Sequence, residues 1–592
     1  MAKNKEPKVL LKRIATPLML FSVSLSSCGI SANSSKESES SLSEASSSLS
    51  ATTQSEESIS SSESSGSSTA VISSEEESSG SAISSKESSL SESSEEESSR
   101  EEFSSSEESS VSSSSESIDQ GAHVCFSVND TDFGSLKGTL DQTLESGETI
   151  TKVEAVPKLG YRFVSWSDGN TSSIRQNESF SGEVNLVAIF DYDALEMPIF
   201  SIYTDNRTPI TSKETYVPGE LAIHNSDGHD EEGMELGIRG RGNYSWSGTE
   251  KKSYRIKFDS KTNLLGQGKG KCKSWTLLAV HCDKTLLRND AAFHFARQLP
   301  SLPFTSTSSF VELYLNGKYD GVYEVCDQMQ VNPYRVNIDD SGEEEDIGYF
   351  LEVDKNASED VIRTDNGMTF ELKSEYANQA QVNYITNYLN ETITALNSRS
   401  RRKIDMFLNI PSLVESYIVE ELFKNLDVGW GSFYLTKPKG EKMSFGPVWD
   451  FDLCAGNAEN DDYDPYFKSP YYTYVGSDYY RYEMQQSEFF LKLRETSWFM
   501  NEVRDRYNEL EEELASIVPH IEMMSSSMSN SFNRNFDRWK IFSKKINREP
   551  SEVLAIKTFQ GQVDYLTDWL NKRIVWLGDF LNGKVDDLNY IY

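Results

Sequence analysis

Cysteine and histidine are scarce in this sequence, and their spacing is not that of a typical metalloprotein. Six cysteines and six histidines occur among 592 residues. No pair has the CxxC spacing and no HExxH pattern is present, so the spacing supports neither a zinc site nor a zinc hydrolase. A Gly-x-Ser-x-Gly elbow is also missing, which leaves an α/β-hydrolase unsupported. The segment 266–271 (GQGKGK) lacks the P-loop spacing GxxxxGK(S/T), and we interpret it as an exposed loop.

Basic residues are also in short supply. The chain has 57 Lys and Arg against 94 Asp and Glu, which gives a formal net charge of -37. Binding to a phosphate backbone requires a basic face. The composition therefore argues against a nucleic-acid partner.

Apolar residues are nearly absent from 31–119, which consists almost entirely of serine and glutamate. Such a segment cannot bury enough surface to offset the entropy lost on ordering. Repulsion between its glutamates favours an extended chain. We predict a disordered Ser/Glu-rich linker over 28–119.

Long apolar runs are missing as well, and the N-terminal run is short. Lysines and arginines precede the apolar residues 14–25, which are too few for a membrane-spanning helix and have the layout of a signal peptide. The following LSSC, ending at Cys28, resembles a bacterial lipobox, in which the cysteine is lipidated and becomes the mature N-terminus. This predicts a signal peptide over 1–27 and an extracytoplasmic, lipid-anchored protein. An ordinary signal peptide with an incidental cysteine and a plain membrane anchor are the alternatives.

The five other cysteines form an odd set without a disulfide pattern. We interpret them as buried apolar residues. One bridge between Cys272 and Cys282 is left open.

Hydrophobic residues return at 120–193 in short alternating pieces. The segment 153–166 (VEAVPKLGYRFVSW) is followed by an Asp-Gly turn and by the strand-like 184–190. These features predict a small all-β module. The stretch resembles the internalin-type B-repeat of surface proteins, which implies a spacer or an adhesive unit.

The remaining 194–592 form one large region. Strand patterns come first, among them 313–323 (LYLNGKYDGVY), which predicts a hairpin turning at Asn316 and Gly317. Amphipathic helical patterns dominate after residue 488. Strands followed by helices predict an α+β domain with a helical C-terminal part.

Segment 412–457 carries the strongest candidate for chemistry. Val, Tyr, Ile and Leu recur at helical spacing from Ser412, which is expected to cap the helix together with Glu415. Asp427 follows in a loop that contains two glycines.

After this loop, 433–435 and 443–445 are expected to pair as a hairpin, and the chain then reaches Asp450 and Asp452. Paired strands lie about 5 Å apart, so the hairpin would bring Asp427 beside these two aspartates. A helix, an Asp loop, a hairpin and a second Asp is also the order of these parts in protein kinases. Ordinary turn and cap chemistry is the alternative explanation.

Two further segments carry residues that suit phosphate groups. In 238–243 (IRGRGN), glycines would let the backbone approach phosphates, and Arg241 is a suitable phosphate ligand. In 251–255 (KKSYR), Lys252 opens a strand, where kinases keep a phosphate-pairing lysine. Each pattern is weak by itself. Asp283, in the nearby 275–289 (WTLLAVHCDKTLLRN), is expected to cap a helix that begins at Lys284.

Taken together, these segments resemble the CotH family of spore-coat-protein-H-like atypical kinases. The resemblance extends from about residue 195 to the C-terminus. It rests on RGRGN, KKSYRIKF, WTLLAVHCDKTLLRN, VELYLNGKYDGVYEV, GYFLEVDK, GPVWDFDLCAGN, NRNFDRW and WLNKRIVWL. It implies a kinase-like fold and transfer of the ATP γ-phosphate to Ser or Thr of secreted or surface proteins, dependent on Mg²⁺ or Mn²⁺.

The resemblance also implies residue roles. Asp450 matches the metal-binding aspartate of the family and Asp427 its catalytic-loop aspartate. Where the family often has Asn after that aspartate, this chain has Ser432. Where it usually has Glu in GVYxLxE, this chain has Asp327, which would pair with a nucleotide-binding lysine at longer range.

The resulting hypothesis assigns the rest of the site. Asp452 or Asn457 would assist Asp450 in holding the metal, and Lys252, Arg241 and Asn243 would contact ATP. The chain's own serine-rich linker is a candidate substrate, since tethering raises its effective concentration to the order of mM. The alternative is a non-catalytic kinase-like adhesin or scaffold displayed on the acidic linker.

Overall fold

The predicted signal peptide 1–27, Cys28 and the predicted linker 28–119 lie outside the residues that the structure describes, and their assignments stay predictions. Among the described residues, no helix combines the length and the apolar character needed to cross a membrane. The structure is a computed structural model that describes four stretches, 121–193, 196–459, 466–475 and 488–587.

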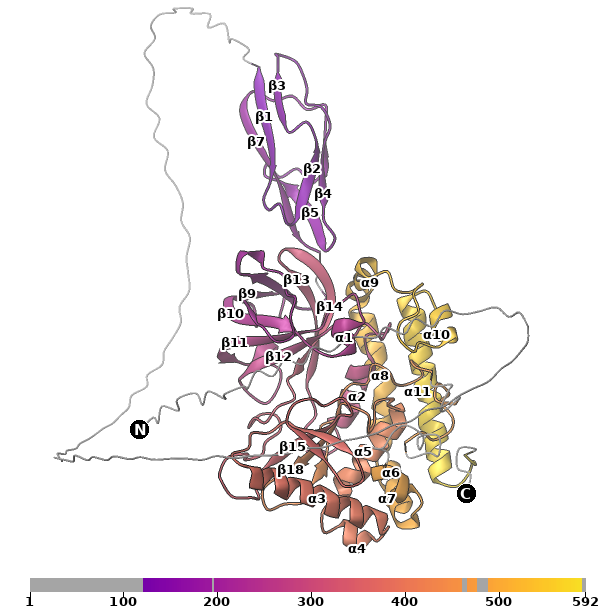
Figure 1. Cartoon of the computed structure of the whole chain (residues 1–592). Helices are drawn as coiled ribbons and strands as arrows, with labels where there is room; N and C mark the ends of the chain where they lie inside the picture. Colours follow the sequence, from indigo (N-terminus) through magenta and orange to yellow (C-terminus); the bar gives the residue numbers. More distant parts are fainter. Residues whose placement is uncertain (1–120, 194–195, 460–465, 476–487, 588–592) are drawn as a thin grey trace, which may run out of the picture. The chain divides into compact units, whose positions relative to one another are not determined.

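The first described part is the predicted all-β module (Figure 1). One sheet has the strand order β3-β1-β7-β5, and a second has the order β2-β4-β6. Alternate residues of β1 point into the core, where Val124 and Phe126 meet Trp166 and Phe190. The strands are β1 (Ala122–Val128), β2 (Gly134–Gly138), β3 (Asp141–Leu144), β4 (Val153–Pro157), β5 (Tyr161–Trp166), β6 (Ile174–Arg175) and β7 (Gly182–Tyr192).

The second part is a closed barrel with the strand order β10-β11-β12-β14-β13-β8-β9. Its β13–β14 hairpin turns at Asn316 and Gly317, both with positive φ, as the Asn-Gly pair predicts. The strands are β8 (Ile199–Thr204), β9 (Val217–His224), β10 (Glu231–Gly240), β11 (Tyr254–Thr262), β12 (Cys272–Leu278), β13 (Ser308–Leu315) and β14 (Lys318–Asp327).

A second, smaller sheet follows the barrel in sequence. Its order is β16-β17-β15-β18-β19, and the predicted hairpin of the 412–457 segment supplies the last two strands. The strands are β15 (Tyr349–Val353), β16 (Val361–Arg363), β17 (Thr369–Leu372), β18 (Phe433–Lys437) and β19 (Ser444–Phe445).

Helices dominate the C-terminal part, so the predicted α+β class is confirmed. Helix α5 is central: all its residues except Pro411 are buried, and it packs on α2, α7 and α11. Figure 1 shows α7 and α11 near it. The helices are α1 (Tyr244–Ser247), α2 (Arg288–Ala296), α3 (Gln379–Asn397), α4 (Arg401–Ile404), α5 (Ile410–Phe423), α6 (Glu488–Arg494), α7 (Ser497–Glu509), α8 (Glu511–Ser527), α9 (Ser529–Arg538), α10 (Ser551–Ala555) and α11 (Phe559–Leu581).

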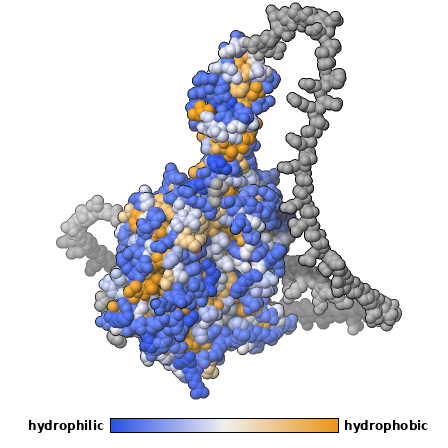
Figure 2. Space-filling model, turned by 180° about the vertical axis from the view of Figure 1, so that it is seen from behind, coloured by the Kyte–Doolittle hydropathy of each residue, from blue (hydrophilic) through white to orange (hydrophobic). Residues whose placement is uncertain are grey.

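The apolar side chains form three main cores, one in the module, one inside the barrel, and one shared by the smaller sheet and the helices. The face seen in Figure 2 is mostly hydrophilic, with apolar residues in patches. Cys272, Cys282, Cys326 and Cys454 are buried and free, so the bridge left open between Cys272 and Cys282 is not formed. Cys125 is partly exposed.

Candidate active site

A cavity of about 360 Å³ lies where the open end of the β18–β19 hairpin faces one end of the barrel. Residues from the barrel, from the smaller sheet and from the segment after α5 line it together. The polar side chains in its lining include Arg241, Asn243, Thr276, Gln328, Glu352, Asp354, Lys373, Asp427, Ser432, Asp450, Asp452 and Asn547.

Helix α5 delivers Asp427 to this cavity. The helix begins at Ile410 after the N-cap Asn409, not at Ser412, so the predicted capping box is wrong. Pro411 in the first turn favours the earlier start. The Ser412 hydroxyl instead donates to the Asn409 carbonyl and accepts from the Phe445 amide, which ties α5 to β19.

The loop after α5 is fixed by local hydrogen bonds. Lys424 ends the helix in the left-handed conformation, with φ 50°. The Asn425 side chain accepts from the Asp427 amide at 3.1 Å, and the Asp427 carbonyl accepts from the Trp430 amide at 2.8 Å. The backbone around Asp427 is therefore held in a tight turn at the mouth of the hairpin.

The hairpin then brings the second aspartate to the first, as the sequence predicted. Leu435 pairs with Phe445 across β18 and β19, and the segments that enter and leave the hairpin at its open end both line the cavity. The Ser432 hydroxyl donates to Asp450 Oδ2 at 3.1 Å. Both residues have positive φ, 54° and 67°. Such backbone conformations outside glycine are uncommon and cluster at functional sites.

The charge of Asp450 raises the pKa values of the two other cavity aspartates, Asp427 and Asp452. Burial, and then the charge of Asp450, raises the pKa of Asp427 to about 7, with Arg548 opposing the shift. Burial, and then the charges of Asp450 and Asp427, raises the pKa of Asp452 well above its usual range. A concentrated set of carboxylate oxygens of this kind is the donor set that Mg²⁺ prefers. The residues present therefore fit a divalent cation.

Asn457 lies behind the aspartates and is not part of the cavity lining. Its amide nitrogen donates to the carbonyls of Cys282 at 2.8 Å and Asp452 at 2.7 Å. In this position it holds the Asp450–Asp452 loop against the end of the barrel. Its predicted role as a metal ligand stays a prediction.

Asn289 also holds the loop that contains Asp450 and Asp452. The sequence analysis assigned it no role. Its Oδ1 accepts from the Phe451 amide at 2.6 Å, and its Nδ2 donates to Glu324 Oε2 at 3.3 Å. Asn289 thus links strand β14 to the residue between the two aspartates. Its place at the end of the WTLLAVHCDKTLLRN segment was the available signal.

Asp283, in the same segment, differs from its predicted role. It was expected to cap a helix from Lys284, but α2 begins at Arg288. Its carboxylate accepts from the Thr285 and Arg288 amides and pairs with the Arg288 guanidinium at 2.5 Å. Both side chains of this pair are fully buried.

The predicted ATP contacts are only partly brought together. Arg241 and Asn243 line the cavity, and the Arg241 guanidinium lies 5.7 Å from the ring centroid of Trp449. Lys252 is outside the lining because its ammonium folds back onto the carbonyls of Trp246 and Thr249. The contact of Lys252 with ATP stays a prediction, and the structure directs its ammonium away from the cavity.

Lys373, just after β17, contributes an ammonium group to the cavity lining. Its Nζ lies 3.0 Å from Glu352 and 2.8 Å from Glu371. Burial lowers its pKa, but the two carboxylates outweigh burial and raise it. The GYFLEVDK segment was noted in the sequence, yet no pattern indicated that Glu352 and Lys373 would meet here.

Asp327 is also outside the cavity lining. It is buried, pairs with Arg335 Nε at 2.8 Å and accepts from the Thr307 hydroxyl at 2.7 Å. The pairing with a nucleotide-binding lysine that the resemblance implied is not formed. Its neighbours Gln328 and Met329 line the cavity instead.

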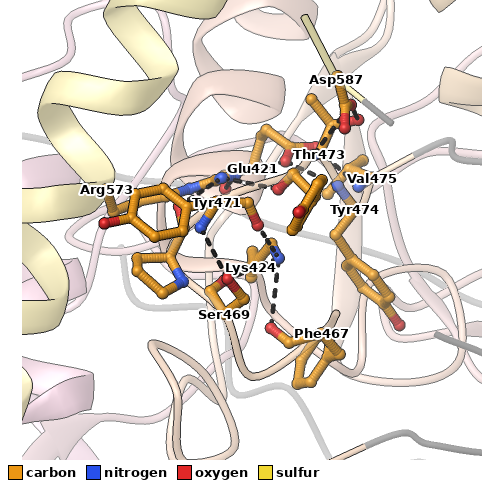
Figure 3. Close-up of polar contacts among 12 residues, drawn as sticks. Glu421, Lys424, Phe467, Ser469, Tyr471, Thr473, Tyr474, Val475, Arg573 and Asp587 are labelled. Atoms are coloured by element: carbon orange, nitrogen blue, oxygen red, sulfur yellow. Dashed lines mark hydrogen bonds and ion pairs between the residues drawn. The ribbon is translucent and has the colours of Figure 1, made fainter. Parts of the chain in front are cut away.

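A buried polar network fixes the chain beyond the aspartates to the helices (Figure 3). Lys424 Nζ donates to carbonyls of the 466–471 segment, at 2.9 to 3.3 Å. Glu421 accepts from the Tyr474 and Val475 amides at 2.8 and 2.7 Å and pairs with Arg573 of α11 at 2.5 Å. The end of α5, just before Asp427, is thereby connected to the 466–475 segment and to α11.

Glu420 gives a test of the electrostatics behind the site. Burial raises its pKa from 4.5 to about 8, and a hydrogen bond from Asn425 opposes the shift. The folded state therefore keeps a proton that the unfolded state releases, and this carboxyl lowers the stability of the parent as pH rises from about 4.5 to 8. Glu420→Gln removes this titration. We therefore expect the difference in Tm, variant minus parent, to be larger at pH 8.5 than at pH 5. Calorimetry would measure it.

The exposed Glu441 offers a matched control for that measurement. Glu441→Gln should change Tm by a similar small amount at both pH values. A Glu420→Gln difference that is constant with pH would show that Glu420 does not hold its proton in the fold.

Comparison with known families covers both folded parts. A family model described as CotH kinase protein matches residues 238–577. A second, described as divergent InlB B-repeat domain, matches residues 125–194. No curated protein matches the chain.

Proposed function

The chain belongs to the CotH kinase family, and on this basis we propose that it transfers the γ-phosphate of ATP to Ser or Thr hydroxyls of secreted or surface proteins. In this reaction the acceptor oxygen forms a bond to the γ-phosphorus, the bond to the β–γ bridging oxygen breaks, and ADP leaves. The observation that carries the proposal is the meeting of Asp427, Asp450 and Asp452 in one cavity with Arg241 and Lys373.

We assign the metal to Asp450 and Asp452, whose oxygens suit Mg²⁺ or Mn²⁺. When bound, such an ion neutralises phosphate charge and orients the transferring group. Ser432 holds one oxygen of Asp450 through its hydroxyl, 3.1 Å away, and so fixes the direction of the carboxylate. Asn289 and Asn457 hold the backbone between and after the two aspartates.

We assign to Asp427, which lines the cavity, the role of acting on the acceptor hydroxyl. Its pKa of about 7 means that it exchanges a proton near neutral pH, which suits a group that orients a hydroxyl and accepts its proton. Arg241 and Lys373 are the cavity cations that would neutralise phosphate oxygens. Lys373 takes the place that the sequence suggested for Lys252.

Anchoring by lipidated Cys28 would place the kinase outside the cytoplasm at the end of a long linker. The linker 28–119 is rich in serine and would reach the cavity without a second molecule. We therefore propose this linker as the first acceptor to examine. The β module 125–194, as a B-repeat, would act as a spacer or an adhesive unit.

Thermal unfolding of the full chain with Mg·ATP tests nucleotide binding. A ligand at ten times its Kd stabilises the fold by about 1.4 kcal/mol, which corresponds to a rise in Tm of a few degrees or less for a domain of this size. We expect this rise to require Mg²⁺ and to disappear when EDTA is added. Circular dichroism or differential scanning fluorimetry would record it.

The control is Asp259→Asn, on an exposed face of β11, which should retain the full rise. No rise with either protein at millimolar Mg·ATP would contradict the kinase and favour the alternative, a non-catalytic scaffold or adhesin with a kinase-like fold.

A further inference from the structure

The outer face of strand β1 carries a histidine and a cysteine that the core does not use. Alternation along β1 turns Val124 and Phe126 inward, so His123 and Cys125 share the opposite face. The register of the sheet then sets their neighbours. Cys125 pairs directly with Asp141 of the edge strand β3, and His123 pairs with Glu183 of β7.

The side chains of this group converge. His123 Nε2 lies 2.7 Å from Asp141 Oδ1 and 3.8 Å from Cys125 Sγ. One ligand atom from each of the three residues lies within 4.8 Å of the other two. A tetrahedral zinc ion with ordinary bond lengths separates its ligand atoms by about 3.3–3.6 Å. Side-chain shifts of about 1 Å or less therefore bring the three atoms to ligand spacing.

The group also has the outer partner typical of a metal-bound histidine. His123 Nδ1 lies 2.8 Å from Glu183 Oε2. A carboxylate on the second ring nitrogen fixes the tautomer that leaves Nε2 free for a metal. The side chains of Asp141 and Glu183 are 74% and 80% exposed, so an ion can enter directly from solvent.

We propose that His123 Nε2, Cys125 Sγ and Asp141 Oδ1 bind a divalent transition-metal ion, with Zn²⁺ as the best-matched one. One thiolate, one imidazole and one carboxylate form a borderline-soft set that suits Zn²⁺ and disfavours Mg²⁺ and Ca²⁺. Three protein ligands leave a fourth position for water or for a ligand from another molecule. The site is independent of the proposed kinase function.

Such an ion would fix the edge strand β3 of the module to its neighbour β1. Strand β3 is short and lies at the end of the sheet order β3-β1-β7-β5. The metal would join Asp141 on β3 to two residues of β1. We therefore expect Zn²⁺ to stabilise the module and to protect its exposed edge.

The charge of the free group sets the pH dependence of binding. Neighbouring carboxylates raise the pKa of His123, because Glu183 and, to a smaller extent, Asp141 accept hydrogen bonds from its protonated ring. Burial, and then the charges of Asp141 and Glu183, raises the pKa of Cys125. Both groups must lose a proton to bind a metal. Affinity for Zn²⁺ should consequently be higher at pH 8 than at pH 6.

Alkylation of Cys125 in the full chain tests the site at a single atom. The other cysteines among the described residues are buried, and peptide mass spectrometry separates Cys125 from the rest. We expect micromolar Zn²⁺ to slow iodoacetamide labelling of Cys125 at least tenfold and EDTA to restore it. Co²⁺ should give a thiolate-to-cobalt absorption band that Cys125→Ser lacks.

Substitutions distinguish a site formed by all three ligands from zinc binding by the Cys125 thiol alone. His123→Gln and Asp141→Asn should lose the protection, and Glu183→Gln should weaken binding about 10–100-fold. His224→Gln is the matched control, because His224 also faces a carboxylate across a strand pair, that of Glu232 at 3.4 Å, and it should leave the protection unchanged. Equal protection in His123→Gln and in the parent, or no protection at all, would overturn the proposal.

Discussion

Asp450→Asn is expected to reduce phosphoryl transfer by at least about 10²–10³-fold, the usual loss when a preorganised electrostatic group is removed from a reacting centre. Asn keeps the size of the side chain and can still accept from Ser432, but it removes the charge that attracts a cation. Transfer is measured with ATP labelled at the γ-phosphate, by following incorporation into the chain itself. The Mg-dependent rise in Tm should disappear in the same variant.

Asp427→Asn should separate binding from chemistry. If Asp427 acts on the acceptor hydroxyl, the variant loses transfer to a similar degree but retains the Mg-dependent rise in Tm. Asp259→Asn, at an exposed position, should be normal in both measurements. Unchanged incorporation in Asp450→Asn and Asp427→Asn would exclude this cavity as the phosphoryl-transfer site.

The approach of Asp427 to Asp450 could be predicted because it depends on a local rule. A hairpin joins the residues just outside its two strands, whatever the rest of the fold does. The β13–β14 turn at Asn316 and Gly317 follows from the same kind of reasoning, since Asn-Gly favours the backbone that a tight hairpin needs. The α+β order of elements could be predicted from periodicity alone.

The lysine of the site could not be predicted in this way. Lys252 was chosen by its place before a strand, but its ammonium binds the carbonyls of Trp246, in α1, and Thr249. Lys373 enters the cavity because β17 pairs with β15, which places Glu352 and Glu371 around it. Such pairing between strands far apart in sequence leaves no local signal. Asp327 pairs with Arg335, which is close in sequence (|i−j| = 8), but no motif marks the two residues as partners.

The group on β1 shows the limit of spacing rules for metal ligands. A search for CxxC or HExxH passes over His123 and Cys125, since they are two residues apart on one strand. Asp141 reaches them only through the antiparallel register of β3. Ligands at alternate positions of one strand can therefore be recognised as a site only when the neighbouring strands and their register are known.

The buried polar network behind Asp427 is expected to contribute more to stability than the ion pairs on the protein surface. Glu421 and Arg573 are fully buried, and the pair joins α5 to α11. The same guanidinium donates to the carbonyls of Pro470 at 3.1 Å and Tyr472 at 2.8 Å. Its loss would leave the buried Glu421 carboxylate without this counter-ion and the carbonyls of Pro470 and Tyr472 without this donor. The network in Figure 3 is therefore expected to contribute strongly to the stability of this region.

Arg573→Met is expected to lower the free energy of unfolding by about 3–5 kcal/mol, the typical cost of removing one partner of a buried ion pair. Lys572→Met is the matched control one residue away on α11. Its ion pair with Asp568 is solvent-exposed, with 48% and 61% of the side chains accessible, and such pairs contribute little to stability. Urea unfolding followed by tryptophan fluorescence would measure both variants against the parent. Equal midpoints for the two variants would mean that the network does not anchor the segment after the aspartates. A loss confined to Arg573→Met would show that the buried pair between α5 and α11 contributes to the stability of the fold.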